Sequence, residues 1–251
     1  MTIKAVIFDI DNTLYNYDAA HASAFQAVSD YVCRNFVLSE AAFLEGYQSS
    51  QDEQLIRAGA TCAAIHNRLL RCQIFLERLG RPIAYAPKMA GLYWSVFLDA
   101  MRPFPDLYPC FTELKRVGYR VGIGTNMTAD YQYAKLRRLE LLDYIDFLVT
   151  SEEVNAEKPD AKLFLRCAEK AGCPPGECVF VGDSLRHDVE GAKNAGMWAV
   201  WIPIHPDAAR SGIYGEAPSE TRTETADIPL LRSLAELPAL LRSMEKQESA
   251  L

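Results

Sequence analysis

Apolar residues fall into two patterns along the chain: short runs that are mostly apolar, and longer stretches with a helical period. Five short runs predict strands buried on both faces, as in a parallel sheet: residues 5–8, 119–124, 147–149, 178–182 and 197–202. Helical periods surround the last four runs, at 107–117, 128–139, 158–172 and 186–195. This alternation predicts an α/β fold, a Rossmann-like parallel sheet sandwiched by helices.

The stretch between the first two predicted strands is helical instead. Apolar stripes predict helices over 18–36, 61–79 and 86–101, with a short helix over 40–44 for which Ser39 is the cap. We therefore expect an inserted α-helical cap domain at 16–102 and an α/β core formed by 1–15 and 103–251. The alternative is that these helices belong to the main core.

The C-terminal part carries weaker signals. Residues 205–225 are polar and rich in Pro, Gly, Ser and Thr, which predicts a loop. Residues 228–231 are compatible with an edge strand and 234–244 with a last helix, and we expect fraying after residue 245.

Polar residues with chemical potential follow the predicted strands or open the helices after them: Asp9, Asp11, Thr125, Asn126, Lys158, Asp183 and Asp188. Ligands of open parallel sheets bind at the carboxyl ends of the strands, so we expect these residues to share one site. Taken alone, Asp9 and Asp11 fit an Asx-rich turn equally well, Thr125 fits a strand end, and Lys158 fits a solvated residue. Asp188 also fits an acid at a helix start.

Composition narrows the class of partner and the compartment. The net charge of −7 argues against a nucleic-acid polymer or an anionic membrane as partner, and a phosphate ligand would need a local cation. The seven cysteines form no Cys-x-x-Cys pair, and no apolar run approaches 18 residues. A strand pattern starts near the first residue, with no signal-peptide pattern, so we expect a cytoplasmic protein with free thiols.

The motif Asp9-Ile10-Asp11-Asn12-Thr13 resembles the first motif of the haloacid dehalogenase (HAD) superfamily, whose members mostly transfer phosphoryl groups. Three further stretches resemble the other family motifs, in the family's order: Thr125-Asn126, Lys158-Pro159, and Gly182-Asp183-Ser184 followed by Asp188. The helical insert is similar to that of the branch with an N-terminal α-helical cap, which implies a small substrate enclosed by the cap.

The resemblance implies a role for each residue. Asp9 is the expected nucleophile and Asp11 the general acid and base. Thr125, Asn126 and Lys158 are expected to hold the phosphate. Mg²⁺ is the expected cofactor; its ligands would be Asp9, Asp183 and the backbone carbonyl of Asp11, with Asp188 acting through a water.

These residues imply a magnesium-dependent phosphatase that hydrolyses a small phosphorylated metabolite, a nucleotide or sugar phosphate, as a monomer or homodimer. A dehalogenase is disfavoured because dehalogenase members lack an acid at the position of Asp11. A sugar phosphate mutase and a non-catalytic binding module remain alternatives. Tyr17 and His21 are interpreted as core or surface residues and His66 as a helix-face residue. His187 is interpreted as solvent-facing or as a local partner of Asp188, and Trp94, Trp198 and Trp201 as core.

Overall fold

A five-stranded, all-parallel sheet lies at the centre of the computed structural model, which describes residues 2–59, 61–203 and 228–248. The strand order is β3-β2-β1-β4-β5. The strands are β1 (Ala5–Phe8), β2 (Arg120–Thr125), β3 (Phe147–Thr150), β4 (Cys178–Gly182) and β5 (Trp198–Trp201). All five predicted strands are present, and the predicted α/β fold with a parallel sheet is confirmed.

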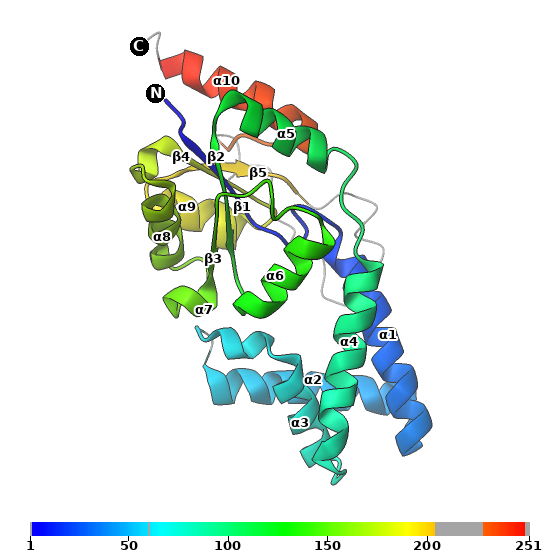
Figure 1. Cartoon of the computed structure of the whole chain (residues 1–251). Helices are drawn as coiled ribbons and strands as arrows, with labels where there is room; N and C mark the ends of the chain where they lie inside the picture. Colours follow the sequence, from blue (N-terminus) through cyan, green and yellow to red (C-terminus); the bar gives the residue numbers. More distant parts are fainter. Residues whose placement is uncertain (1, 60, 204–227, 249–251) are drawn as a thin grey trace.

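Helices cover both faces of the sheet, as the continuous apolar runs require (Figure 1). Val6 and Phe8 of β1 join a core with α5 (Leu107–Val117) and α10 (Leu237–Glu248). Ala5 and Ile7 point to the opposite face, where they pack with α8 (Ala161–Ala171) and α9 (Gly191–Asn194). The central strand is therefore buried on both sides.

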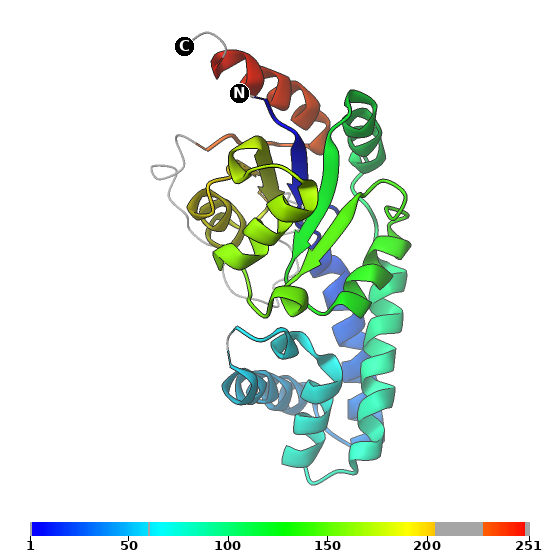
Figure 2. The same cartoon turned by 60° about the vertical axis from the view of Figure 1, so that its left-hand side comes forward.

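Four long helices lie beyond the carboxyl ends of the strands (Figures 1 and 2). They are α1 (Tyr17–Phe36), α2 (Glu40–Ala58), α3 (Arg68–Arg78) and α4 (Ala86–Ala100). Helices α1 and α4 run side by side from the sheet, and α2 and α3 pack at one side of this pair. The chain leaves the sheet and returns to it at one place, where Tyr15 forms a bridge with Pro103 and the Phe104 N–H donates to the Leu14 carbonyl at 3.1 Å.

Short elements complete the described fold: η1 (Ala63–His66), η2 (Ile83–Tyr85), α6 (Ala129–Arg138), α7 (Ser151–Val154), η3 (Pro175–Glu177), η4 (Leu185–Glu190) and η6 (Leu234–Glu236). Several bounds differ from the sequence prediction. The short helix expected at 40–44 continues to Ala58, and the helix expected over 61–79 is interrupted at Asn67, whose side chain caps α3. The helix expected over 186–195 starts as the wide turn η4 and continues as α9.

The C-terminal predictions are met in part. The edge strand expected at 228–231 is reduced to one bridge between Trp201 and Leu230, because Pro229 has no N–H to continue the ladder. The last helix is present and extends to Glu248, whereas the loop expected at 205–225 lies outside the described residues. All seven cysteines are free thiols. Within the described ranges, no helix combines the length and apolarity that a membrane crossing requires.

Candidate active site

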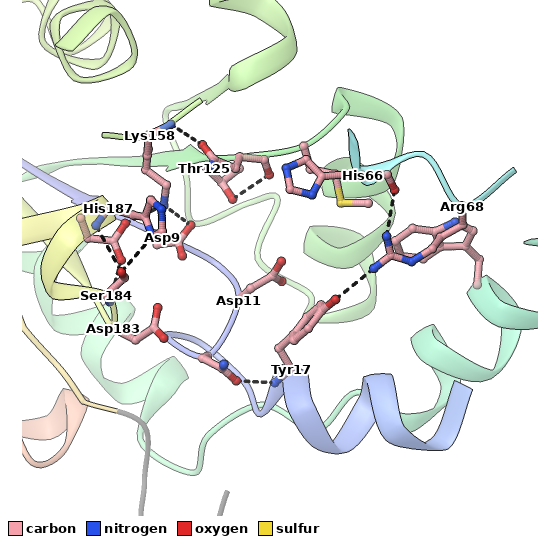
Figure 3. A pocket seen from close by; sticks show the side chains of 15 residues that line it. Asp9, Asp11, Tyr17, His66, Arg68, Thr125, Lys158, Asp183, Ser184 and His187 are labelled. Atoms are coloured by element: carbon pink, nitrogen blue, oxygen red, sulfur yellow. Dashed lines mark hydrogen bonds and ion pairs between the residues drawn. The ribbon is translucent and has the colours of Figure 1, made fainter. Parts of the chain in front are cut away.

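The turn after β1 directs two carboxylates into one cavity (Figure 3). The Asp9 N–H donates to the Val181 carbonyl at 2.9 Å, which holds Asp9 against β4. The chain then turns tightly, because the Leu14 N–H donates to the Ile10 carbonyl at 3.0 Å and Asn12 adopts a left-handed conformation with φ of 57°. Asn tolerates this conformation better than most residues. The turn leaves Ile10 buried while Asp9 and Asp11 line the cavity.

Lys158 is buried between two of the carboxylates. Its Nζ lies 2.8 Å from Asp9 Oδ1 and 2.6 Å from Asp188 Oδ1. Its backbone N–H donates to Asn126 Oδ1 at 2.8 Å, which connects it to the end of β2. Burial alone would lower the pKa of Lys158, but the Asp188 and Asp9 carboxylates raise it above its ordinary value. The lysine is therefore held as a cation next to Asp9.

Asp183 follows β4, and the first turn of η4 brings Asp188 back beside it. One oxygen each of Asp9, Asp183 and Asp188 lies within 4.8 Å of the others. The Ser184 N–H donates to Asp188 Oδ2 at 3.0 Å and fixes that side chain. A Cβ atom added to Gly182 would lie 2.3 Å from Asp188 Cγ, so only glycine permits this approach.

The three carboxylates carry more negative charge than Lys158 neutralises. Burial raises the pKa of Asp9 to about 6, against the attraction of Lys158 and with the repulsion of Asp188 and Asp11. Burial also raises the pKa of Asp183 well above its usual range, and the neighbouring Asp188 and Asp9 add to that shift. An all-oxygen donor set with this excess charge fits a hard divalent cation such as Mg²⁺.

Thr125 and Asn126 end β2 beside Asp9 and Lys158, as predicted, and both line the cavity. Thr125 Oγ1 accepts a hydrogen bond from Gln132 Nε2 at 2.9 Å, and Gln132 Nε2 also donates to the Asn126 carbonyl at 2.6 Å. Through Gln132, helix α6 thus fixes the end of β2. All seven residues predicted for the site line a single cavity.

Asp11 has a partner that the sequence analysis missed. Lys135 of α6 has no exposed surface, and its Nζ lies 2.8 and 2.7 Å from the two Asp11 carboxylate oxygens. The Tyr15 hydroxyl donates to Asp11 Oδ1 at 2.6 Å. Lys135 lies four residues after Tyr131 and four before Leu139, on the apolar face of α6. This position could have indicated from the sequence that Lys135 is buried.

The wall of the cavity opposite the sheet comes from the helical segment. The cavity has a volume of about 200 Å³, and Tyr17, His66, Arg68 and Trp94 close it on this side. His66 Nε2 lies 3.0 Å from Glu157 Oε2, next to Lys158 in the sequence, so η1 is joined to the sheet side. These four residues were not assigned to the site from sequence, because none belongs to a motif.

The weaker sequence interpretations have mixed outcomes. His21 is buried, as expected for a core residue, with Nδ1 at 2.6 Å from the Tyr93 hydroxyl. His187 is exposed, as one interpretation expected, and it also lines the cavity. Its Nδ1 lies 3.1 Å from Ser184 Oγ, so its hydrogen-bond partner is Ser184. Trp94 is buried as predicted. The core prediction for Trp198 is wrong: it is 37% exposed, because its Nε1 reaches out to the Gly176 carbonyl.

The structure combines a parallel α/β sheet with a cluster of three acids and a lysine that contacts two of them. The comparison with known families identifies the class of protein as a hydrolase. Residues 3–196 match the family described as haloacid dehalogenase-like hydrolase. The chain belongs to this family, and the resemblance drawn from the motifs is confirmed.

Known relatives narrow the class further. The ribulose-1,5-bisphosphate 5-phosphatase of Halopiger xanaduensis is 33% identical, over 94% of this chain and 98% of that one. A glyceraldehyde 3-phosphate phosphatase of Methanothermobacter thermautotrophicus is 32% identical, over 80% of this chain and 85% of its own length. The crystal structure of a HAD phosphatase from Thermococcus onnurineus is 31% identical with a TM-score of 0.66, and covers 95% of this chain and 98% of that one. The predicted enzyme class, a HAD-type phosphoric monoester hydrolase, is confirmed.

Proposed function

We propose that this protein is a magnesium-dependent phosphatase that hydrolyses a small phosphorylated metabolite through an aspartyl-phosphate on Asp9. The observation that carries the proposal is the position of Lys158 Nζ, which contacts Asp9 and Asp188 while Asp183 completes a cluster of three acids. A phosphate ester carries negative charge, so this acidic site binds it only with additional positive charge. That requirement, together with the all-oxygen donor set, supports Mg²⁺ as cofactor.

The carboxylates of Asp9 and Asp183 and the backbone carbonyl of Asp11 would hold the ion, with Asp188 behind them. When bound, Mg²⁺ supplies charge neutralisation and alignment of the phosphate with Asp9. Asp188 is bonded on one oxygen by Lys158 and on the other by the Ser184 N–H, which suits a supporting position rather than direct attack. Lys158 contacts Oδ1 of Asp9, and in the proposed reaction the Asp9 carboxylate attacks through Oδ2.

The reaction proceeds in two displacements. Asp9 attacks the phosphorus atom, and the bond from phosphorus to the alcohol oxygen of the substrate breaks while the Asp11 carboxyl group delivers a proton to that oxygen. Water then attacks the phosphorus of the aspartyl-phosphate, gives its proton to Asp11, and releases inorganic phosphate from Asp9. Lys158 and the Thr125 hydroxyl bind the phosphate oxygens in both steps.

The helical segment would select the alcohol that leaves. We assign residues 16–102 as a cap and residues 1–15 with 103–251 as the core, supported by the single crossing point beside Tyr15 and Pro103. Tyr17 and Trp94 present ring surface to the cavity, which excludes bulk water from the reacting atoms. The relatives are named for ribulose bisphosphate, glyceraldehyde 3-phosphate and N-acylneuraminate 9-phosphate, which favours a phosphorylated sugar over a nucleotide.

The test is phosphate release from a panel of sugar phosphates, triose phosphates and nucleotides, with Mg²⁺ and with EDTA. We expect release only with Mg²⁺, and a loss of at least about 10³-fold in kcat for Asp9→Asn, since the nucleophile is removed. Asp30→Asn, which alters an exposed acid of α1, is the matched control and should keep full activity. Equal turnover by Asp9→Asn and wild type would refute the mechanism.

A further inference from the structure

Arg68 is a buried cation that no acid neutralises. It is 7% exposed, and its Nη1 and Nη2 donate to the His66 carbonyl and the Tyr17 hydroxyl, both at 3.2 Å. Its guanidinium carbon lies 5.0 Å from the centre of the Tyr93 ring. Across residues 2–59, 61–203 and 228–248, no carboxylate oxygen lies within 4.0 Å of its nitrogen atoms. The charged residues at the opposite end of the cavity are all accounted for. Lys158 and Asp11 have ion-pair partners, and Asp9, Asp183 and Asp188 form the acidic cluster.

Two buried donors on this wall lack acceptors. Arg68 Nε and Trp94 Nε1 are both inaccessible and have no hydrogen-bond partner in the described part of the chain. Both side chains line the cavity. Guanidinium and indole nitrogens donate and never accept, and a buried donor without an acceptor is destabilising. In the described part of the chain these two donors therefore have no acceptor, and no carboxylate is paired with Arg68.

The position of Arg68 relative to the reacting atoms is fixed from two sides. Figure 3 shows Arg68 across the cavity from Lys158, with Asp11 between them. The His66 carbonyl that binds Arg68 belongs to the residue whose ring contacts Glu157 at 3.0 Å, and the Tyr17 hydroxyl holds the other guanidinium nitrogen. A molecule with its phosphate at Lys158 thus extends towards a cation held in a set place.

We propose that Arg68, which lines the cavity, binds a second oxyanion of the substrate. The substrate is then a small phosphomonoester that carries a carboxylate or a second phosphate at its other end. A planar guanidinium matches both groups, because its paired N–H donors fit two oxygens of a carboxylate or phosphate. This inference rests on the proposed phosphatase function and defines its substrate class. The oxyanion would supply the negative charge that Arg68 lacks among the described residues.

A purely structural role makes a different prediction. If Arg68 served only to pack against Tyr93 and Tyr17, its loss would reduce stability and weaken all substrates alike. If it binds a second oxyanion, its loss acts on substrates that have one. The measured quantity is therefore a ratio of kcat/KM within a matched pair of substrates.

Two pairs separate the two oxyanions. 3-Phosphoglycerate and glycerol 3-phosphate differ by a carboxylate, and fructose 1,6-bisphosphate and fructose 6-phosphate differ by a phosphate. In wild type we expect the two-anion member of at least one pair to have the higher kcat/KM, by about 10- to 100-fold, as expected for charged hydrogen bonds. In Arg68→Gln this ratio should fall to about one. Arg78→Gln, on the exposed side of α3, should leave the ratio unchanged.

Binding to Asp9→Asn, measured by titration calorimetry with the same pairs, gives the preference without turnover and separates the two proposals. No hydrolysis together with a preference that Arg68→Gln abolishes would refute the phosphatase function and keep the oxyanion site. Hydrolysis with ratios near one in both pairs, or with equal losses for both members in Arg68→Gln, would overturn the oxyanion site. If Arg68→Gln does not fold by circular dichroism, Arg68→Lys keeps the charge but removes the planar pair of donors, and it should lower the ratio about fivefold.

Discussion

At the scale of single residues, the site depends on how each carboxylate is paired. Asp9 and Asp188 share Lys158, whereas Asp11 is held on both oxygens by Lys135. Burial lowers the pKa of Lys135, although the Asp11 carboxylate opposes that shift. The two lysines thus keep the proposed nucleophile and the proposed acid–base group in separate ion pairs.

Lys135 should act on catalysis through Asp11. We expect Lys135→Met to lower kcat by about 10- to 100-fold, because Asp11 loses the contact that orients it. In the Asp11→Asn background the same substitution should cost little more, since residues that act as one unit are not additive. The measurement is a double-mutant cycle on kcat, with circular dichroism to verify folding. Independent, multiplicative losses would show that Lys135 does not work through Asp11.

At the scale of elements, the strands were predictable because each is apolar over most of its length. The site residues after them were predictable because strand ends of a parallel sheet meet at one edge. The helices of the insert were found, yet their inward faces were harder to assign. The apolar stripe that predicted α3 contains Leu69 and Cys72. Cys72 is buried as expected, but Leu69 is 44% exposed, and the charged residues Arg68 and Arg71 are buried.

The reason for this error is physical. The buried positions of α3 follow a helical period that begins at Arg68, and two of them are arginines, which are almost never fully buried without a partner. A search for apolar stripes does not find such positions. Lys135 was missed for the same reason, because the partner that allows its burial, Asp11, is far away in the sequence.

The close approach of η4 to β4 gives an element-scale test. Gly182→Ala would force Asp188 away, because the new Cβ would lie 2.3 Å from its carboxyl carbon. We expect the Mg²⁺ concentration for half-maximal activity to rise about tenfold or more, with a stability loss of about 1–3 kcal/mol from overpacking. Gly176→Ala, where a Cβ meets no atom within 4 Å, is the control and should change neither quantity. A normal Mg²⁺ dependence in Gly182→Ala would show that Asp188 can move without consequence.

At the scale of the whole molecule, the local field of the site differs from the overall charge. The chain carries a net charge of −7, which repels anionic substrates at long range. Inside the cavity, Lys158 and Arg68 stand at opposite ends (Figure 3), and Lys135 forms an ion pair with Asp11. In the proposed function, substrate binding depends on these buried cations, which salt screens only weakly.

Global stability should depend on His21. Burial lowers the pKa of His21 to about 3, and the charges of Arg68 and Arg71 add to that shift. Below its ordinary pKa of about 6.5 an unfolded histidine binds a proton that the folded one rejects, so the free energy of unfolding falls as pH falls. Between pH 7.5 and 5 we expect wild type to lose about 2 kcal/mol more than His21→Gln does. Urea denaturation at the two pH values measures this; parallel losses would contradict it.

The central place of β1 has a consequence for the order of events during synthesis. One edge of β1 pairs with β2 and the other with β4, whose first residue, Cys178, is separated from Phe8 by about 170 positions. At the usual elongation rate of about 5–20 residues per second, the ribosome needs about 10–35 s to supply that second edge. During this time the edge of β1 that later pairs with β4 has no partner strand, although all four of its residues are buried in the final fold. The helical insert is synthesised in the same interval. The strand that precedes the other four in the chain is thus among the last to be enclosed.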